Sequence, residues 1–460
     1  MQTKLSYGYG SFGKDFSLAL VNVFLFFYLT DVAGMSAATV GIIFLIARIW
    51  DTINDPIWGY IVAKTNTRWG KYKPWLLIGN VFNFIFMVAC FSTHYFEGTT
   101  QVIYLAVVYI CWGMAYTMCD APFWSLIPTI TLDKGEREGL LPYPRFTATI
   151  GSYMASGFGI YAVNLFGQGD EGFGYLIYAA IGGLLAISSA WVTCKWTEQN
   201  YEESGSDDFN IKEAISIVTH NKQFLIFLSL AFCFVIGTGI SGALNLYMFK
   251  YAIKDESLFS TMMFASSVVA IPALIGFKAM VNTIGRKVVF ILAITLPFFY
   301  TAVLTLASWG LLPIYPMVLL SGGLSGFSTA VYWLLVMIMV ADTVDYGRSE
   351  SIYYSLHTLL AKCSGAVSSA VVGFFLTAVN YVPNVEQSQD TIDAIVSLYW
   401  GITFLCLIGG AIYIFAYKLN GSVLDDIQRT LTRRYMDKVV ANAVAKDVQE
   451  DLEALKKIQG

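Results

Sequence analysis

The sequence predicts an all-α membrane protein in which twelve transmembrane helices form two six-helix bundles. Apolar residues make up 56% of the 460-residue chain and charged residues only 13%, whereas about a quarter of a soluble domain is charged. Apolar runs also recur at lengths near the roughly 20 residues that a spanning helix needs. Too few charges remain to cover a water-facing surface, so we expect a multi-pass protein in a lipid bilayer, without a nucleic-acid partner.

The predicted spans are apolar runs separated by charged or Gly/Pro-rich breaks. They cover residues 8–31, 36–63, 75–95, 101–130, 143–166, 174–196, 223–251, 258–283, 287–308, 311–341, 351–380 and 392–418. The stretch 198–222 is acidic at its start and has no apolar run. It is predicted to be a cytoplasmic loop between an N-terminal bundle, 1–197, and a C-terminal bundle, 223–418. The charged segment 419–460 is predicted to be a cytoplasmic tail.

Basic residues are concentrated in alternate loops. The loop after the second span contains Lys64, Arg68, Lys71 and Lys73. Its segment WGKYKPW, 69–75, is typical of an anchor at the membrane surface. The intervening loops carry mainly acidic residues, with Lys250 and Lys254 as exceptions. Because basic loops stay in the cytoplasm, both termini are predicted to be cytoplasmic, with the chain in the inner (cytoplasmic) membrane.

Six plus six helices is the plan of many secondary transporters, whose substrate site lies near the midplane between the two repeats. The sequence has no GxxxxGK[ST] phosphate loop, which argues against ATP-driven transport. It also has no selectivity-filter repeat, which argues against a channel. No nucleophile–base pair or redox motif can be placed. Neither enzymatic activity nor a cofactor is therefore expected.

Ionisable residues inside the predicted spans are the best candidates for a functional site. Each costs roughly 2.5–3.5 kcal/mol at a helix centre on insertion scales. Four are acidic and four are basic: Asp15, Asp51, Asp55, Asp120, Lys14, Arg48, Arg145 and Lys362. The equal number of each sign predicts that they pair or face a water-filled cavity. Charge pairs that only lock helices together are the alternative interpretation.

The second span places several of these groups on one helix face. Arg48, Asp51 and Asp55 stand at i, i+3 and i+7, a spacing that aligns side chains along a helix. Asn54 adds an amide next to them. Two carboxylates and an amide oxygen suit a hard cation such as Na⁺, or a shared proton.

The fourth span repeats this spacing with Thr117, Asp120 and Trp124. This stripe adds a hydroxyl and a carboxylate to the predicted site and an aromatic wall beside it. Ordinary packing explains Trp124 and Trp333 equally well. His357 lies in a span five residues before Lys362 and is a further candidate for substrate contact.

Long segments of this chain resemble one known family. They include KLSYGYGSFGKDF, ARIWDTINDPIWGYIV, RWGKYKPW, WGMAYTMCDAPFWSLIPTITLDKGERE, LPYPRF, VMIMVADTVDYG and YVPNVEQS. The chain resembles the glycoside–pentoside–hexuronide:cation symporters of the major facilitator fold, and among them the melibiose carriers. The matching segments lie in both halves and cover nearly the whole chain except the middle loop and the tail.

The resemblance implies uptake of a galactoside such as melibiose, coupled to Na⁺, Li⁺ or H⁺, by a carrier that can work as a monomer. The family's cation site corresponds to Asp51, Asn54, Asp55 and Thr117. Its sugar-binding residues correspond to Lys14, Asp15, Asp120, Trp124, Arg145, Trp333 and Lys362.

The chain departs from the melibiose carriers at positions that bear on sugar choice. It has Asn22, Phe24 and Phe27 in place of tyrosines, Val336 and His357 in place of glutamines, and a shorter loop around Arg348. Two other functions therefore stay open. One is an H⁺-coupled symporter of another glycoside or a hexuronide, and the other is a membrane sugar sensor that does not transport.

Overall fold

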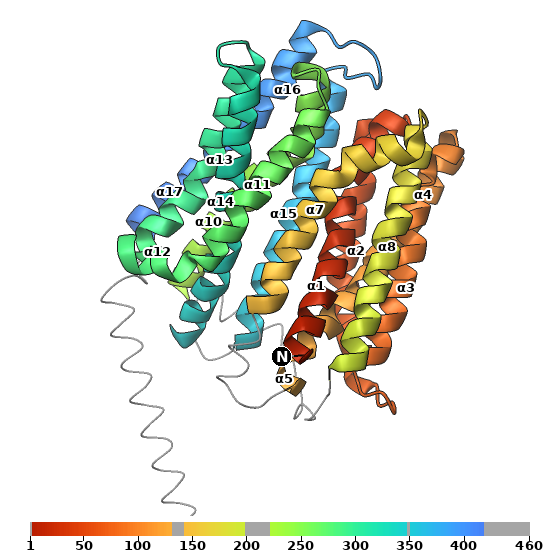
Figure 1. The fold of residues 1–460 in the computed structure, drawn as a ribbon, viewed down its shortest axis with the longest axis vertical. Coiled ribbons are helices and arrows are strands. Elements are labelled where there is room, and N and C mark those ends of the chain that lie inside the picture. The colour runs from red at the N-terminus through yellow and green to blue at the C-terminus, as the bar shows by residue number, and fades with distance from the viewer. Residues whose placement is uncertain (1, 131–141, 198–220, 347–349, 418–460) are drawn as a thin grey trace, which may run out of the picture.

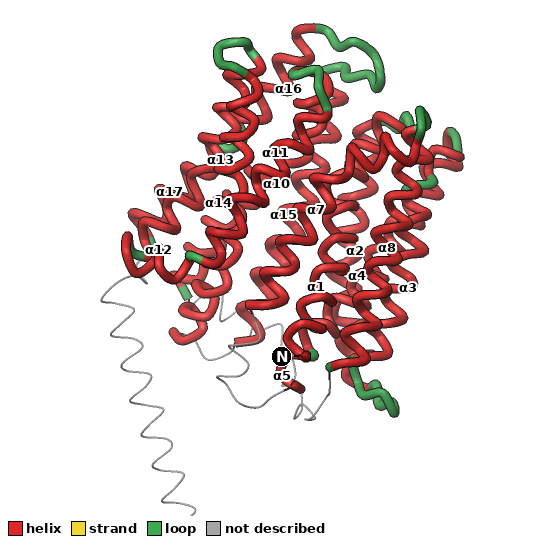
Figure 2. The backbone as a smooth tube through the Cα atoms, viewed as in Figure 1, coloured by secondary structure: helices red, strands yellow, loops and turns green. Residues whose placement is uncertain are grey.

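The computed structural model describes residues 2–130, 142–197, 221–346 and 350–417 (Figure 1). Within these ranges all regular structure is helical (Figure 2). The predicted middle loop, apart from residues 221 and 222, lies outside the described residues. So do the predicted tail, 419–460, and the loop at Arg348.

The N-terminal helices run close to the predicted spans. They are α1 (Gln2–Leu20), the wide π-turns η1 (Val21–Leu25) and η2 (Tyr28–Val32), α2 (Ala37–Lys64), α3 (Lys73–Cys90), the short η3 (Thr93–Tyr95), α4 (Gly98–Ser125), α5 (Ile127–Ile130), α7 (Pro142–Gly167) and α8 (Glu171–Trp196). The first helix begins six residues before its predicted start at residue 8. A hydrogen bond to another helix holds its polar first turns. The hydroxyl of buried Tyr7 donates to the carbonyl of Phe123 on α4.

The C-terminal helices differ from prediction at two breaks. They are α10 (Lys222–Tyr247), continued by the π-turn η4 (Met248–Ala252), α11 (Ser257–Ile275), α12 (Phe277–Ile284), α13 (Arg286–Ser308), α14 (Ile314–Tyr346), α15 (Glu350–Ala378), α16 (Gln389–Gly401) and α17 (Phe404–Ala416). The predicted span 258–283 is divided at Gly276, shortly after Pro272 inside α11. The predicted span 392–418 is divided at Ile402–Thr403. Hydropathy stays high across both breaks, so apolar runs alone do not reveal them.

Ten helices of the described chain are long and apolar enough to cross a membrane. The first helix and α7 complete the twelve; they are more polar and lie at the centre of the structure. Close approach explains the small residues of α7. A Cβ atom added to Gly151 would lie 2.5 Å from the carbonyl oxygen of Phe12 on α1, which is too close for any side chain.

The two bundles meet along α2 with α15 and along α7 with α11. In Figure 1 these helices run through the middle of the molecule. On α15, a Cβ atom added to Gly373 would lie 2.4 Å from the carbonyl oxygen of Ala37 at the start of α2. This contact lets two backbones touch where helices of different bundles cross.

Candidate functional site

The first part of the site lies between α2 and α4. Thr117 Oγ1 donates a hydrogen bond to Asp55 Oδ1 at 3.0 Å. Arg48 Nη1 donates to Asp51 Oδ2 at 3.1 Å, as expected for neighbours at i and i+3. Asn54 is buried on the same helix. The structure therefore brings Asp51, Asp55 and Thr117 to one helix–helix contact, with Asn54 beside them in sequence.

Two polar atoms of this cluster have no hydrogen-bond partner among the described residues. They are Asp51 Oδ1 and Asn54 Nδ2, and both are buried. An unsatisfied buried polar group costs about 1–3 kcal/mol, and a carboxylate oxygen can only accept. The nitrogen and oxygen of the Asn54 side-chain amide have nearly the same shape. A half-turn rotation of this amide would therefore place its oxygen where the nitrogen now lies. These carboxylate, amide and hydroxyl oxygens are the kind of ligand that a hard cation prefers.

Space beside the unpartnered Asp51 oxygen depends on a glycine that the sequence analysis missed. A Cβ atom added to Gly113 on α4 would lie 2.7 Å from Asp51 Oδ1, the unpartnered oxygen. We expect Gly113→Ala to weaken cation binding by roughly tenfold or more, about the effect of losing one oxygen ligand or of 1.4 kcal/mol. The measurement is the cation concentration for half-maximal ligand-induced stabilisation.

Gly242→Ala on α10 is the matched control, because nothing lies within 4 Å of its added Cβ. It should leave the half-maximal concentration unchanged. Equal cation affinity in Gly113→Ala and the wild type would show that the cation does not approach Asp51 Oδ1.

The second part of the site is centred on Lys14 of α1. The side chain of Lys14 is almost fully buried. Its ammonium donates to Asp120 Oδ1 on α4 and lies 3.6 Å from Asp15 Oδ2. Trp124 Nε1 donates to the same Asp120 oxygen at 3.2 Å. A charged group in the apolar interior is thus compensated from two helices, which confirms the predicted pairing of opposite charges.

An arginine extends this group to a third helix. The Arg145 guanidinium on α7 lies 4.4 Å from the ring centroid of Trp124, within the range of a cation–π contact. Arg145 is exposed, and the side chain of Asp120 is one-third exposed. Five of the seven predicted sugar-binding residues therefore come together from α1, α4 and α7, with polar groups facing accessible space.

Lys362 connects the two parts of the site across the bundle interface. It lies on α15, and its ammonium donates to Asp55 Oδ2 on α2. Its charge also acts on Asp120. The residue predicted to bind sugar is therefore bonded to a residue predicted to bind the cation.

Trp333 on α14 is the predicted residue that lies farthest from this arrangement. Its ring packs edge-on against Tyr332 and His357. The buried His357 is within electrostatic reach of Arg145. Among the contacts of the described residues, His357 is the one that connects Trp333 to the N-terminal residues.

A second polar cluster lies near the start of α2 and was not predicted from the sequence. Asp31, the last residue of the first predicted span, is fully buried at the end of the first helix. It accepts hydrogen bonds from the hydroxyls of Tyr251 and Tyr381, and Lys250 Nζ lies 3.1 Å from it. All three partners belong to the C-terminal half. We call Asp31, Lys250, Tyr251, Tyr381 and Asn384 the Asp31 latch.

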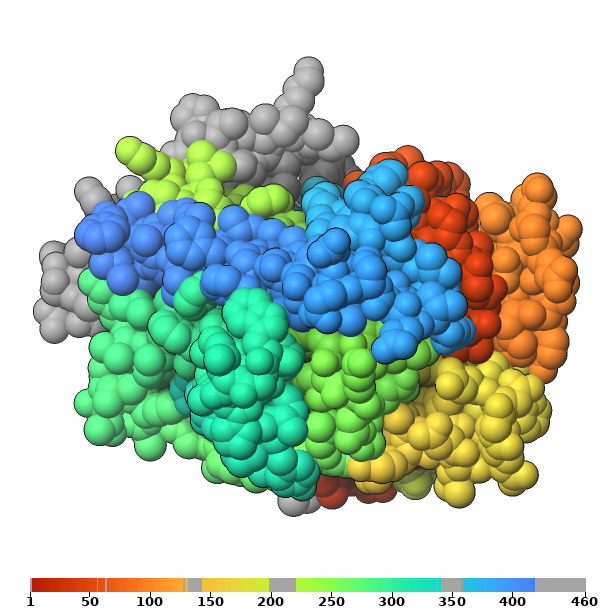
Figure 3. Space-filling view, turned by 90° about the horizontal axis from the view of Figure 1, so that it is seen from above, coloured from red at the N-terminus to blue at the C-terminus, as the bar shows by residue number. Residues whose placement is uncertain are grey.

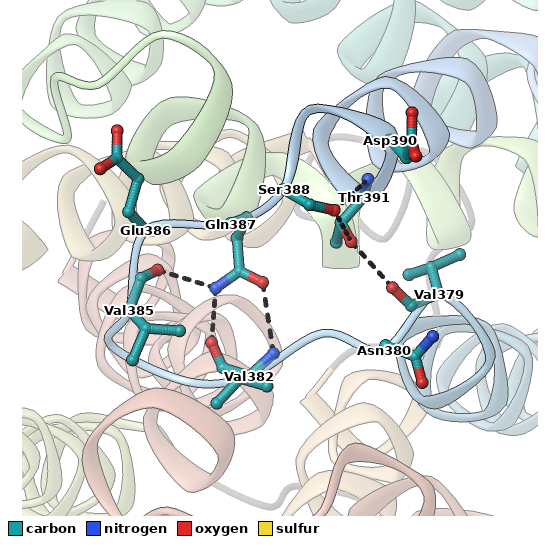
Figure 4. Close-up of a pocket in the computed structure, with 9 residues that line it drawn as sticks. All are labelled: Val379, Asn380, Val382, Val385, Glu386, Gln387, Ser388, Asp390 and Thr391. Carbon is teal, nitrogen blue, oxygen red and sulfur yellow. Dashed lines mark hydrogen bonds between the residues drawn. The ribbon is translucent and has the colours of Figure 1, made fainter.

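The loop after α15 supplies two members of the Asp31 latch. Gln387 folds back, donating to the carbonyls of Val382 and Val385 and accepting from the Val382 N–H, beside a surface pocket of about 490 Å³ (Figure 4). This closed loop holds Asn384, whose amide donates to the Asp31 carbonyl and whose Oδ1 accepts from Lys250. Burial and then the neighbouring Asp31 charge raise the pKa of Tyr381, so it stays a donor.

The Asp31 latch closes one end of the molecule. Thr30 also bonds Tyr247 there, and Phe24 packs edge-on against Phe259. Figure 3 looks onto this end and shows segments of both halves in contact across it. One sequence signal did point to the latch: Lys250 was a basic exception at an otherwise acidic end.

Twelve spanning helices in two bundles, with paired charges at their interface, define a multi-pass membrane transporter and not an enzyme. The family model described as MFS/sugar transport protein matches residues 6–421. The chain belongs to this family.

Curated relatives are similar over most of their length. An isoprimeverose transporter of Lactiplantibacillus pentosus is 28% identical, over 91% of this chain and 88% of its own. A putative glycoside/cation symporter of Escherichia coli (strain K12) is 27% identical, over 94% and 95%. A glucuronide carrier protein homolog of the same organism is 26% identical, over 86% and 87%.

Solved structures share the fold at low identity. The nucleoside transporter NupG has a TM-score of 0.63 at 16% identity, over 91% of this chain and 100% of that chain. A bacterial homolog of the human lysosomal transporter Spinster has a TM-score of 0.63 at 14% identity, over 90% and 96%. These likenesses show the major facilitator fold alone.

Proposed function

We propose that this protein is a cation-coupled symporter of a glycoside. The hydrogen bond between Lys362 and Asp55 carries the proposal, because it joins the predicted sugar site to the predicted cation site across the two bundles. A secondary transporter needs such a connection, since the cation gradient can drive the sugar only if binding of one ligand changes binding of the other.

The proposed coupling step exchanges one positive charge for another at Asp55. Without a bound cation, the Lys362 ammonium compensates the Asp55 carboxylate. A cation held by Asp51, Asn54, Asp55 and Thr117 would supply that charge instead and release Lys362. The freed ammonium, with Lys14, Asp15, Asp120 and Arg145, would then bond sugar hydroxyls while Trp124 or Trp333 covers an apolar sugar face. By linkage, each ligand tightens the other by the same factor.

The finer proposal names a galactoside such as melibiose as substrate and Na⁺ as the coupling ion, with Li⁺ or H⁺ as substitutes. The long segments shared with the melibiose carriers support it, including all four cation positions. The relative described as a glycoside/cation symporter supports cation coupling in general.

Transport would proceed by alternating access in the inner membrane, with both termini in the cytoplasm and a monomer as the working unit. Under this orientation the Asp31 latch lies at the outer side. The described contacts between the bundles there would then belong to an inward-facing state.

A hexuronide is the second candidate substrate. The Arg145 guanidinium lies over Trp124 within the predicted sugar site, and a guanidinium suits a carboxylate substrate in charge and shape. The similarity to a glucuronide carrier protein homolog favours the same candidate.

The deciding experiment is uptake of radiolabelled melibiose into cells that lack other galactoside carriers, with and without added Na⁺. Na⁺-stimulated accumulation is expected. A panel of other glycosides and glucuronides, used as competitors, separates the two substrate classes. Lack of uptake across the panel, with the protein present in the membrane, would overturn the symporter proposal and favour a sugar sensor.

A further inference from the structure

The end of the N-terminal bundle opposite the Asp31 latch is strongly basic. Where the described ends of α2, α3 and α8 meet, the charged residues are all positive: Lys64, Arg68, Lys71, Lys73 and Lys195. At the other end of the same bundle Glu97, Asp170 and Glu171 are found. We call the five positive residues the basic end.

Aromatic rings lie beside several of these positively charged side chains. Lys195 Nζ lies 4.8 Å from the ring centroid of Trp191 and 4.9 Å from that of Trp196. Lys64 and Lys71 similarly lie over Tyr60 and Tyr72. Trp191 is 52% exposed. Tryptophan at the end of a spanning helix sits at headgroup depth, so Lys195 is held at that depth too.

The two lysines nearest the bilayer-facing surface lie on adjoining helix ends. Cys194 Sγ donates to the carbonyl oxygen of Lys73 at 3.6 Å, which places the last turn of α8 against the first turn of α3. Lys73 and the exposed Lys195 therefore stand at two helix ends that touch.

Exposed apolar residues also lie along the same two helices. Ile78 and Phe82 on α3 and Leu184 on α8 are exposed, although α3 and α8 pack closely together, with Phe84 against Gly183. A ligand that fits this surface has an anionic head at Lys73 and Lys195 and an apolar tail along the helices.

We propose that α3 and α8 form a binding site for one anionic phospholipid, with its phosphate between Lys73 and Lys195. Charge complementarity and the exposed apolar residues of the same two helices favour a lipid as the occupant, since a soluble anion or an acidic protein would not use those apolar residues. Basic surfaces between spanning helices bind anionic headgroups in this way. The site is independent of the sugar and cation sites.

Native mass spectrometry of the purified, delipidated full-length protein tests this site by titration with phosphatidylglycerol and with phosphatidylcholine. The wild type is expected to bind one phosphatidylglycerol more tightly than any phosphatidylcholine. Lys73→Gln with Lys195→Gln should weaken that binding roughly fivefold for each lysine removed. Lys73→Arg with Lys195→Arg should retain it.

Two exposed lysines elsewhere are the matched controls, Lys278→Gln on α12 and Lys254→Gln at the Asp31 end. Neither should change phosphatidylglycerol binding. Equal lipid binding by the double glutamine variant and the wild type would overturn the proposal. So would loss of binding in the arginine variant, or displacement of the lipid by inorganic phosphate alone, which would indicate a simple anion site.

Discussion

Replacing Asp55 by cysteine is expected to weaken cation stimulation of sugar binding strongly. Asp55 accepts hydrogen bonds from Thr117 on α4 and Lys362 on α15. The substitution removes one of the two carboxylates of the proposed cation site and leaves Lys362 without its counter-charge. Asp55 is one-third exposed, so we expect cation affinity to fall roughly tenfold to hundredfold, less than for a fully buried ion pair.

Sugar binding in membrane vesicles, measured with and without Na⁺, checks this expectation. Glu386→Gln is the control, because it removes an acidic side chain that is 87% exposed in the loop after α15. It should leave Na⁺ stimulation intact. If Na⁺ still stimulates sugar binding in Asp55→Cys, then Asp55 is not part of the cation site.

The second large effect is expected at the Asp31 latch. Lys250→Gln leaves the Asp31 carboxylate buried without its cation, which costs on the order of 3 kcal/mol or more. Asp31→Asn should be milder, because it removes the charge and keeps an acceptor oxygen for the tyrosines. We expect Lys250→Gln to separate the two bundles at this end and to reduce uptake at least tenfold.

A double-mutant cycle tests the pairing of these two residues. Asp31→Asn combined with Lys250→Gln should recover part of the uptake lost in Lys250→Gln, because no unpaired charge remains. Distances between spin labels on the two bundles at this end report the opening directly. Purely additive effects of the two substitutions, with unchanged label distances, would contradict the latch.

Hydropathy predicted the fold closely because lipid imposes it on the chain. Each backbone group in the bilayer must be bonded within its own helix, so apolar runs of sufficient length mark the helices. The breaks after Pro272 and at Ile402–Thr403 escaped prediction because they interrupt the helix without interrupting the apolar run.

The site was predictable to the extent that it depends on charge inside a helix. Arg48 and Asp51 lie where their spacing put them, and Lys14 and Asp120 pair as their opposite signs suggested. The partner of each charge depends on which helices touch, which the spacing along one helix does not encode. The link from Lys362 to Asp55 is of this kind, since 307 residues separate them.

Gly113 and Asp31 show the other limit. Gly113 has no side chain that could mark it as functional in the sequence. Its expected role follows only from the short distance between Asp51 Oδ1 and a Cβ atom built onto Gly113. Asp31 stands where the apolar run of the first predicted span ends, and nothing in the sequence assigns it a partner. The first helix continues past it through two π-turns, which carry the carboxylate into the contact between the bundles.

The equal number of opposite charges in the two parts of the candidate site has a consequence for the electrical behaviour of the proposed cycle. The four basic residues Lys14, Arg48, Arg145 and Lys362 equal in number the four acidic residues Asp15, Asp51, Asp55 and Asp120. The empty carrier would therefore reorient without moving net charge. With one cation bound it would move a single positive charge, worth about 2.3 kcal/mol per 100 mV. Membrane voltage would then accelerate inward movement of the loaded carrier and leave the return of the empty carrier unaffected.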